Sequence, residues 1–267
     1  MSKTADSFET YYEFNKYNEN DPIIFVHGIG LTCKIWDDQI SYFSDPKLKK
    51  YNTIVYDLIG HGKTPLNKKR MTVKDFSKQL LSLVDSLNIK TFHLVGFSIG
   101  SLIAQDFAFT ESDRLSSLVL FGTVYKRSED EKRQIINRYE TMKLKKNLSK
   151  IRALQRWFTE KFLKENPKIY KKIYSMLEKT NQDTWLKIYK IFVEHVDDDM
   201  KIKQITARTL LITGEKDVGS KPRMSEEISK LIQGSLCKII KDGRHLCNIE
   251  CAENFNLTVK EFIDNKK

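Results

Sequence analysis

Short apolar runs that end close to a glycine recur along the chain. Runs of this length bounded by glycine are typical of strands buried within a sheet. They cover residues 23–27, 53–56, 92–95, 117–121, 209–212 and 236–240. The pattern therefore predicts a strand in each of these segments.

Helical periodicity fills most of the intervals between the apolar runs. One interval is an amphipathic stretch that Thr72 and Asp75 are predicted to open with a capping box. Its apolar residues are Val73, Phe76, Leu80, Leu83 and Leu87. Strands and helices in alternation predict an α/β fold, with a mostly parallel sheet covered by helices on both faces.

The glycines indicate which edge of the sheet is functional. Nine of the eleven lie at or just beyond the carboxyl end of a predicted strand. In open α/β sheets the ligand crevice lies at this edge. We therefore expect the functional residues in the loops that follow the strands.

One long interval breaks the alternation. Residues 125–201 contain no predicted strand but several amphipathic helices, one of them opened by Pro167. An all-helical insertion between two strands is expected to form a cap over the crevice. The predicted organisation is a core domain in residues 1–124 and 204–267, interrupted by a helical cap in residues 125–203.

Charge is distributed unevenly between the core and the cap. The formal net charge is +11, and residues 125–201 carry 20 Lys and Arg against 12 Asp and Glu. These basic residues are scattered among acids rather than gathered with aromatics into a binding module, so we expect no nucleic-acid partner. Two hypotheses for the cap charge stay open, a solvated helical surface or the steering of anionic substrates.

The sequence also constrains compartment and cofactors. The N-terminus has no signal-peptide pattern and no apolar stretch approaches the ~18 residues of a membrane span, so we expect a cytoplasmic protein with no span. Four cysteines, Cys33, Cys237, Cys247 and Cys251, show neither a disulfide framework nor the CxxC pairs of a zinc site. We expect no metal and no cofactor.

Residues 96–100, Gly-Phe-Ser-Ile-Gly, match the pattern G-x-S-x-G. They follow a predicted strand and precede a predicted helix, which is the context that a nucleophile elbow requires. Small residues two before and two after the serine allow a strained turn that exposes its hydroxyl in the crevice. We therefore interpret Ser98 as a nucleophile.

A serine hydroxyl needs a base at neutral pH, and His245 is the best placed of five histidines. It follows the last predicted strand at the crevice edge. His93 lies inside a strand and His195 on a predicted cap helix. His27 and His61 precede glycines in early loops, where we expect them to brace the backbone.

An acid should orient the base, in the chain order Ser, Asp, His. Residues 213–217 follow the penultimate predicted strand and offer two carboxylates, Glu215 and Asp217. We favour Asp217, because Glu215 directly follows the glycine that ends the strand and is expected to brace the turn.

The developing oxyanion needs two backbone N–H donors. The pattern predicts Ile99, directly after the nucleophile, and Ile29, in the glycine-rich loop after an early strand. A covered and largely apolar acyl pocket is expected beneath the cap. Its predicted lining residues are Phe97, Tyr125, Trp157 and Trp185.

These motifs together resemble the α/β-hydrolase superfamily along essentially the full length of the chain. They are residues 27–30 (HGIG), 57–62 (DLIGHG), 96–100, 213–217 and 243–245. Trp36 and Gln39, the cap string at residues 156–159 with Pro167 downstream, and residues 249–250 are similar to the 3-oxoadipate enol-lactonase group and its esterase relatives. Ser101 and Arg244 depart from that group's pattern.

The resemblance implies hydrolysis of a carboxylic ester or lactone through an acyl-enzyme, without a cofactor. Superfamily members that act on haloalkanes or epoxides carry Asp where this chain has Ser98. Two alternatives stay open: a receptor or stress-signalling regulator with slow turnover, and a cofactor-free perhydrolase or haloperoxidase. We expect a small-molecule ester or lactone as partner, and a monomer or homodimer.

Overall fold

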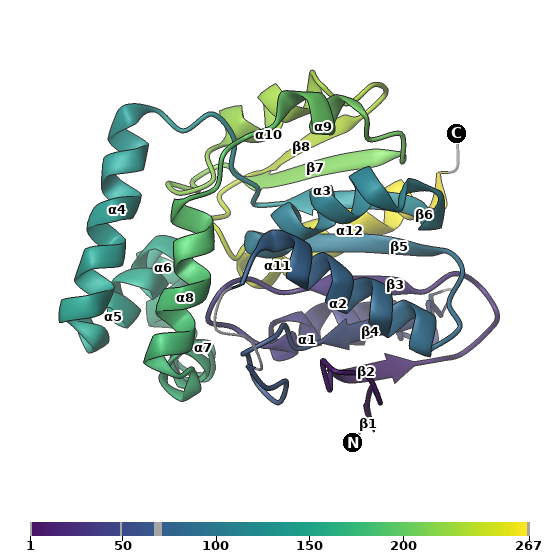
Figure 1. The fold of residues 1–267 in the computed structure, drawn as a ribbon, viewed down its shortest axis with the longest axis horizontal. Coiled ribbons are helices and arrows are strands. Elements are labelled where there is room, and N and C mark those ends of the chain that lie inside the picture. Colours follow the sequence, from purple (N-terminus) through teal and green to yellow (C-terminus); the bar gives the residue numbers. More distant parts are fainter. Residues whose placement is uncertain (1, 49, 67–70, 266–267) are drawn as a thin grey trace.

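Eight strands form one sheet in the computed structural model, which describes residues 2–48, 50–66 and 71–265 (Figure 1). All six strands predicted from the apolar runs are among them, and the expected α/β class is confirmed. The strands are β1 (Ser2–Lys3), β2 (Tyr11–Asn15), β3 (Ile23–Val26), β4 (Thr53–Tyr56), β5 (Phe92–Phe97), β6 (Leu115–Phe121), β7 (Thr209–Gly214) and β8 (Leu236–Ile240).

The sheet is parallel except at one edge. Its order is β1-β2-β4-β3-β5-β6-β7-β8, and every pairing from β4 to β8 is parallel. β2 runs antiparallel to β4, with Tyr12 opposite Tyr56, and β1 runs antiparallel to β2. The sequence did not predict these two edge strands, because their residues are exposed or only partly buried for the most part and form no continuous apolar run.

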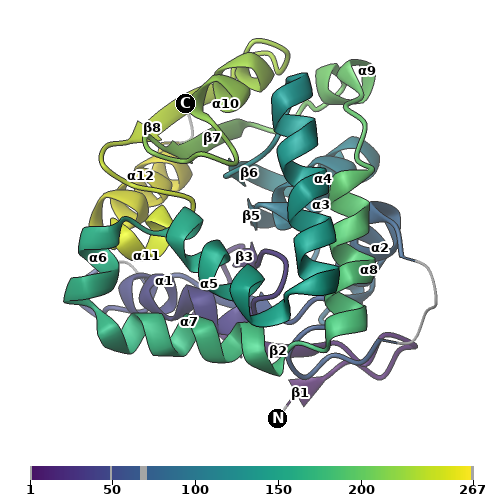
Figure 2. The same cartoon turned by 90° about the vertical axis from the view of Figure 1, so that its left-hand side faces the viewer.

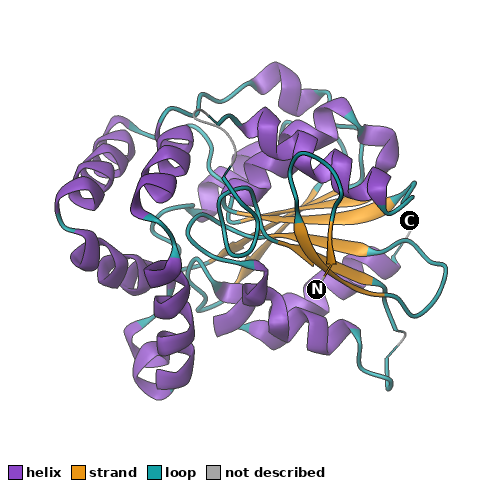
Figure 3. Ribbon diagram, turned by 60° about the horizontal axis from the view of Figure 1, so that its bottom comes forward, coloured by secondary structure: helices purple, strands orange, loops and turns teal. Residues whose placement is uncertain are grey.

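Helices cover both faces of the sheet (Figure 3). α1 and α12 contact each other behind the sheet in the view of Figure 1, whereas α2 and α3 contact each other in front of it. Within the described residues no helix has both the length and the apolar character needed to cross a bilayer. The helices of the core are α1 (Asp37–Phe43), α2 (Val73–Ser86), α3 (Ile99–Thr110), α10 (Pro222–Ser229), α11 (Cys247–Glu250) and α12 (Ala252–Asp264), with single turns at Cys33–Trp36 and Ser112–Arg114.

The central strands are buried on both faces. Every residue of β3, β4, β5 and β7 is buried. A strand covered on both sides must be apolar at successive positions instead of alternating. This explains why continuous apolar runs were sufficient to predict the central strands.

Residues 125–203 are all described and contain helices but no strand. Figure 2 looks onto them, with α4 beside α8 and α5 beside α7 at one end of the sheet. The last helix, α9, contacts the core helix α3. The helices are α4 (Glu129–Leu144), α5 (Lys146–Trp157), α6 (Glu160–Glu165), α7 (Pro167–Lys179), α8 (Gln182–Val193) and α9 (Asp199–Lys203).

Two buried histidines join the loops that follow β3 and β4. His27 Nε2 accepts the N–H of Leu58 at 3.0 Å, and His61 Nε2 accepts the N–H of Gly30 at 3.0 Å. Each ring can act in this way only while it is neutral. Burial lowers the pKa of His27 to about 4 and that of His61 to about 3, the latter with a contribution from the His27 charge. The two rings therefore brace the loops as neutral acceptors, as expected from the sequence.

These histidines should make the fold sensitive to acid. The unfolded chain binds protons near the ordinary His pKa of about 6.5, whereas native His27 resists protonation down to about 4, so stability is lost as the pH falls through this window. Urea unfolding at pH 7 and pH 5 should show a loss of roughly 2 kcal/mol for each imidazole. The double variant His27→Gln/His61→Gln keeps acceptors but cannot titrate, so it should lose less. Equal losses in both proteins would contradict this explanation.

Candidate active site

Ser98 occupies the turn between β5 and α3. Its backbone has φ 56° and ψ −114°, in a region that side-chain-bearing residues rarely adopt. The turn is held by a hydrogen bond from Ser98 N–H to the carbonyl of Phe121 at 2.9 Å. A Cβ on Gly96 would lie 2.2 Å from the carbonyl oxygen of Gly100, so only glycine fits there.

Asp217 and His245 lie in the loops that follow β7 and β8. His245 Nδ1 is 2.6 Å from Asp217 Oδ2, and both side chains are buried apart from the opening to a pocket. The other carboxylate oxygen, Oδ1, accepts the N–H groups of Gly219 at 2.8 Å and Ser220 at 3.0 Å. These two bonds fix the carboxylate so that Oδ2 faces the imidazole.

Glu215, the other candidate acid, is directed elsewhere. It is exposed, and its Oε2 accepts the N–H of Asp242 at 3.0 Å. Its role in this structure is to close the turn between the ends of β7 and β8.

The same pocket brings Ser98, Asp217 and His245 together. The ring of Phe97 stands 4.8 Å from the His245 ring, centroid to centroid. Gly122, at φ 57°, leaves room for the imidazole, since a Cβ there would lie 3.2 Å from His245 Cε1. The ends of β5, β6, β7 and β8 thus converge on one point.

Ile29 and Ile99, which the sequence predicts as oxyanion donors, both lie close to Ser98. A Cβ on Gly28 would be 3.4 Å from Ser98 Cβ, so the loop that carries Ile29 runs beside the serine. Ile99 is the first residue of α3. Within the described residues, neither N–H group forms a hydrogen bond with another backbone group.

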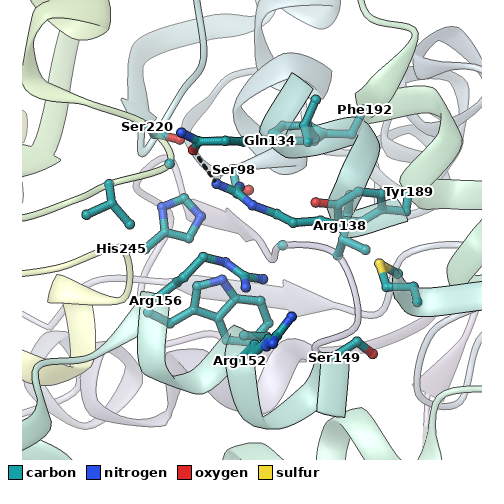
Figure 4. Close-up of a pocket in the computed structure, with 18 of the residues that line it drawn as sticks. Ser98, Gln134, Arg138, Ser149, Arg152, Arg156, Tyr189, Phe192, Ser220 and His245 are labelled. Carbon is teal, nitrogen blue, oxygen red and sulfur yellow. Dashed lines mark hydrogen bonds between the residues drawn. The ribbon is translucent and has the colours of Figure 1, made fainter. Parts of the chain in front are cut away.

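Aromatic and cationic side chains from α4, α5 and α8 line one side of the pocket (Figure 4). Three of the four predicted lining residues, Phe97, Trp157 and Trp185, line it. The sequence also predicted Tyr125 as a lining residue. This prediction is wrong, because Tyr125 is not one of the residues that line the pocket. Its side chain is buried at the base of the cap, where the hydroxyl donates to Asp199 at 2.6 Å.

Four arginines, which the sequence analysis counted only as part of the cap charge, also line the pocket. They are Arg127, Arg138, Arg152 and Arg156, and we call them the arginine cluster. Helical spacing offered a signal, because Arg152 and Arg156 are one turn apart on α5 and share a face. Without the positions of α4 and α5, this face could not be distinguished from a solvated one.

Glu250 ties the cap to the loop of His245. Its Oε1 accepts the N–H of Thr159, the residue directly before α6, at 2.8 Å. Its Oε2 accepts the N–H of Arg244, directly before His245, at 2.9 Å. One partly buried carboxylate thus connects the cap with the loop that carries His245.

A second bond secures the other side of His245. The N–H of Leu246 donates to the carbonyl of Trp157, at the end of α5, at 3.0 Å. Arg244 adds a side-chain bond from Nη1 to the carbonyl of Gln155 at 2.5 Å. Both neighbours of His245 are therefore anchored to the cap.

Metal-binding geometry is absent from the described part of the chain. No group of three or more His, Cys, Asp or Glu side chains within residues 2–48, 50–66 and 71–265 could hold a metal ion. The four cysteines are free.

Several known hydrolases are similar to this chain along nearly its whole length. The (E)-2-((N-methylformamido)methylene)succinate hydrolase of Acinetobacter baylyi is 27% identical over 98% of this chain and 95% of its own length. The 3-oxoadipate enol-lactonase 2 of the same organism is 26% identical over 96% and 94%. The crystal structure of the enol-lactonase from Burkholderia xenovorans LB400 superposes with a TM-score of 0.86 at 23% identity, covering 97% of each chain.

A protein-family model also matches most of the chain. The model described as alpha/beta hydrolase fold matches residues 21–251, which span the sheet from β3 to β8, the cap and the His245 loop. This chain belongs to the α/β hydrolase fold family.

Proposed function

We propose that this protein hydrolyses a carboxylic ester or lactone through an acyl-enzyme on Ser98. The observation that carries the proposal is the 2.6 Å contact between His245 and a fully oriented Asp217, in the pocket that Ser98 lines. Family membership and the similarity to a lactonase and a succinate-derivative hydrolase support the reaction class.

The first half of the reaction forms the acyl-enzyme. His245 Nε2 takes the proton of Ser98 Oγ as this oxygen attacks the substrate carbonyl. Asp217 holds the Nδ1 proton and stabilises the imidazolium. The same proton then passes to the leaving alcohol oxygen, and the C–O bond breaks.

The backbone of the elbow stabilises the negative charge of the intermediate. As the carbonyl oxygen becomes an oxyanion, the N–H groups of Ile29 and Ile99 donate to it. Such donors are already oriented, so no reorganisation is needed at the moment of reaction. The amino end of α3 adds a favourable partial positive charge behind Ser98.

Water completes the cycle. With His245 neutral again, a water molecule loses a proton to Nε2 and attacks the acyl carbonyl, and the proton returns to Ser98 Oγ as the acid leaves. A lactone passes through the same steps with its alcohol still attached to the acyl group. We assign the reaction to the cytoplasm, which the free cysteines support because reduced thiols persist there.

Replacing either end of the proton transfer should abolish turnover. Ser98→Ala and His245→Ala should each lower kcat on p-nitrophenyl acetate by about four to six orders of magnitude, and the double variant should lose little more, since the two residues act as a unit. A fluorophosphonate probe should label Ser98 alone. Wild-type turnover in Ser98→Ala, or labelling of another serine, would refute the assignment.

The two carboxylates near β7 offer a matched comparison. Asp217→Asn preserves shape but cannot hold the Nδ1 proton, so kcat should fall by about 10⁴-fold with the fold intact. Glu215→Gln, two residues away and directed toward Asp242, should stay within about threefold of wild type, because it touches no reacting group. Steady-state kinetics with thermal unfolding of both variants tests the choice, and exchanged outcomes would show that it is wrong.

Glu250 should act on catalysis through the position of His245. In Glu250→Gln one acceptor oxygen becomes an amide donor that faces an N–H group, so the loop should loosen and kcat should fall by about tenfold while KM changes little. The rate of fluorophosphonate labelling of Ser98 should fall in parallel. Glu253→Gln, an exposed acid at the start of α12, is the control and should match wild type. A loss of melting temperature without a loss of kcat would indicate a purely structural role.

A further inference from the structure

The arginine cluster gives the pocket a cationic wall formed by the cap. Arg138 comes from α4, Arg152 and Arg156 from α5, and Arg127 from the loop before α4. Figure 4 shows Arg138 and Arg156 extending toward the space beside Ser98 and His245, with Arg152 farther from both. All four side chains line the pocket; Arg127, Arg138 and Arg156 are partly buried, whereas Arg152 remains exposed at its rim.

Among the described lining residues, no acid forms an ion pair with this cluster. They include two carboxylates, Glu131 and Asp217. Glu131 pairs with Lys221 at 3.0 Å and with Arg223, and Asp217 holds His245. Within the described residues none of the four arginines forms an ion pair, and the side-chain partner of Arg138 is the Gln134 amide oxygen at 3.4 Å.

Without a ligand, holding these positive charges close together destabilises the protein. Burial, followed by the nearby charges of Arg138 and Arg152, lowers the pKa of Arg156 to about 10, so it remains a cation at neutral pH. Arg127 donates through Nη1 to the carbonyl of Phe192 at 3.0 Å, but its Nη2 is buried without a partner among the described residues. An unsatisfied buried donor destabilises the protein, and Arg127 lines the same pocket as the other three arginines.

We propose that the arginine cluster is an anion subsite that selects esters or lactones carrying two further ionised carboxylates. This inference rests on the proposed hydrolysis at Ser98 and names its substrate class. Several guanidinium groups on two helices exceed what one carboxylate can engage, whereas two separated carboxylates can each accept a forked pair of N–H groups. The aromatic lining, including Trp157 and Trp185, contacts the carbon skeleton between the charges.

Binding of simple acids to the wild-type protein tests the subsite without catalysis. Isothermal titration at pH 7.5 should show succinate binding at least about tenfold more tightly than butyrate, which matches it in length but has one carboxylate. Succinate should also slow labelling of Ser98 by the fluorophosphonate, which locates it in this pocket. Inorganic phosphate, a compact dianion, should bind more weakly than succinate. Equal binding of succinate and butyrate, or tighter binding of phosphate, would overturn the proposal.

Substitutions of single arginines test whether succinate binds to the arginine cluster. Arg138→Gln and Arg156→Gln should each weaken succinate binding by about tenfold, and Arg156→Lys should fall between, because lysine keeps the charge but lacks the planar fork. Arg133→Gln on α4 is the control, since Arg133 pairs with Asp130 and is exposed. A melting temperature close to wild type verifies the fold of each variant. Unchanged succinate affinity in both glutamine variants would reject the assignment.

The two proposals fail in different ways. If Ser98→Ala keeps its turnover while succinate binds as expected, the hydrolytic mechanism is wrong and the anion subsite stands. If Ser98→Ala is inactive but succinate binds no better than butyrate, the hydrolase stands and the dicarboxylate class is wrong. Raising the salt concentration should weaken succinate binding more than butyrate binding, because screening acts on each charge; equal weakening would count against the proposal.

Discussion

Ser98 can hold its left-handed backbone only because residues 96 and 100 have no side chains. A Cβ on Gly100 would lie 2.6 Å from the carbonyl oxygen of Val26 in β3, so α3 packs directly against the strand that leads to the Ile29 loop. Such strain costs about 1–3 kcal/mol and persists where surrounding packing fixes it. Here the fully buried strands β3 and β5 supply that packing. The serine hydroxyl and both candidate oxyanion donors are thereby positioned by one close contact between a helix and the sheet.

Local sequence was informative wherever one residue type decides a local structure. Glycine spacing around Ser98 predicted the elbow, and continuous apolar runs predicted the central strands, because a strand with two covered faces has no other composition available. The hairpin of β1 and β2 was not predicted, since an edge strand gains its order from pairing with β4 and needs no apolar run. The break between α5 and α6 at Phe158, where the backbone is extended, also lies outside what apolar periodicity can reveal.

The side chains of the site also divide into those that the sequence could predict and those that it could not. Asp217 and His245 could be selected from order along the chain, because parallel strands bring their carboxyl ends to one edge. Tyr125 could not be placed, since its position depends on the pairing of its hydroxyl with Asp199, 74 residues later. The arginine cluster and Glu250 depend on how α4, α5 and α11 meet. Their spacing along the chain is compatible with a solvated surface as well as with a pocket.

The cap leaves the sheet after β6 and returns at β7, and these two strands are hydrogen-bonded neighbours. The sheet therefore fixes the two ends of this insertion whatever its length. Each doubling of the length of a loop raises the entropic cost of closing it by only about 0.6 kcal/mol. The arginine cluster belongs to the insertion, whereas Ser98, Asp217 and His245 belong to the loops of the sheet. Divergence of one gene copy can therefore exchange the groups that we propose recognise the substrate while inheriting the proposed catalytic groups intact, provided that the new insertion keeps an acceptor for Leu246 and a partner for Glu250.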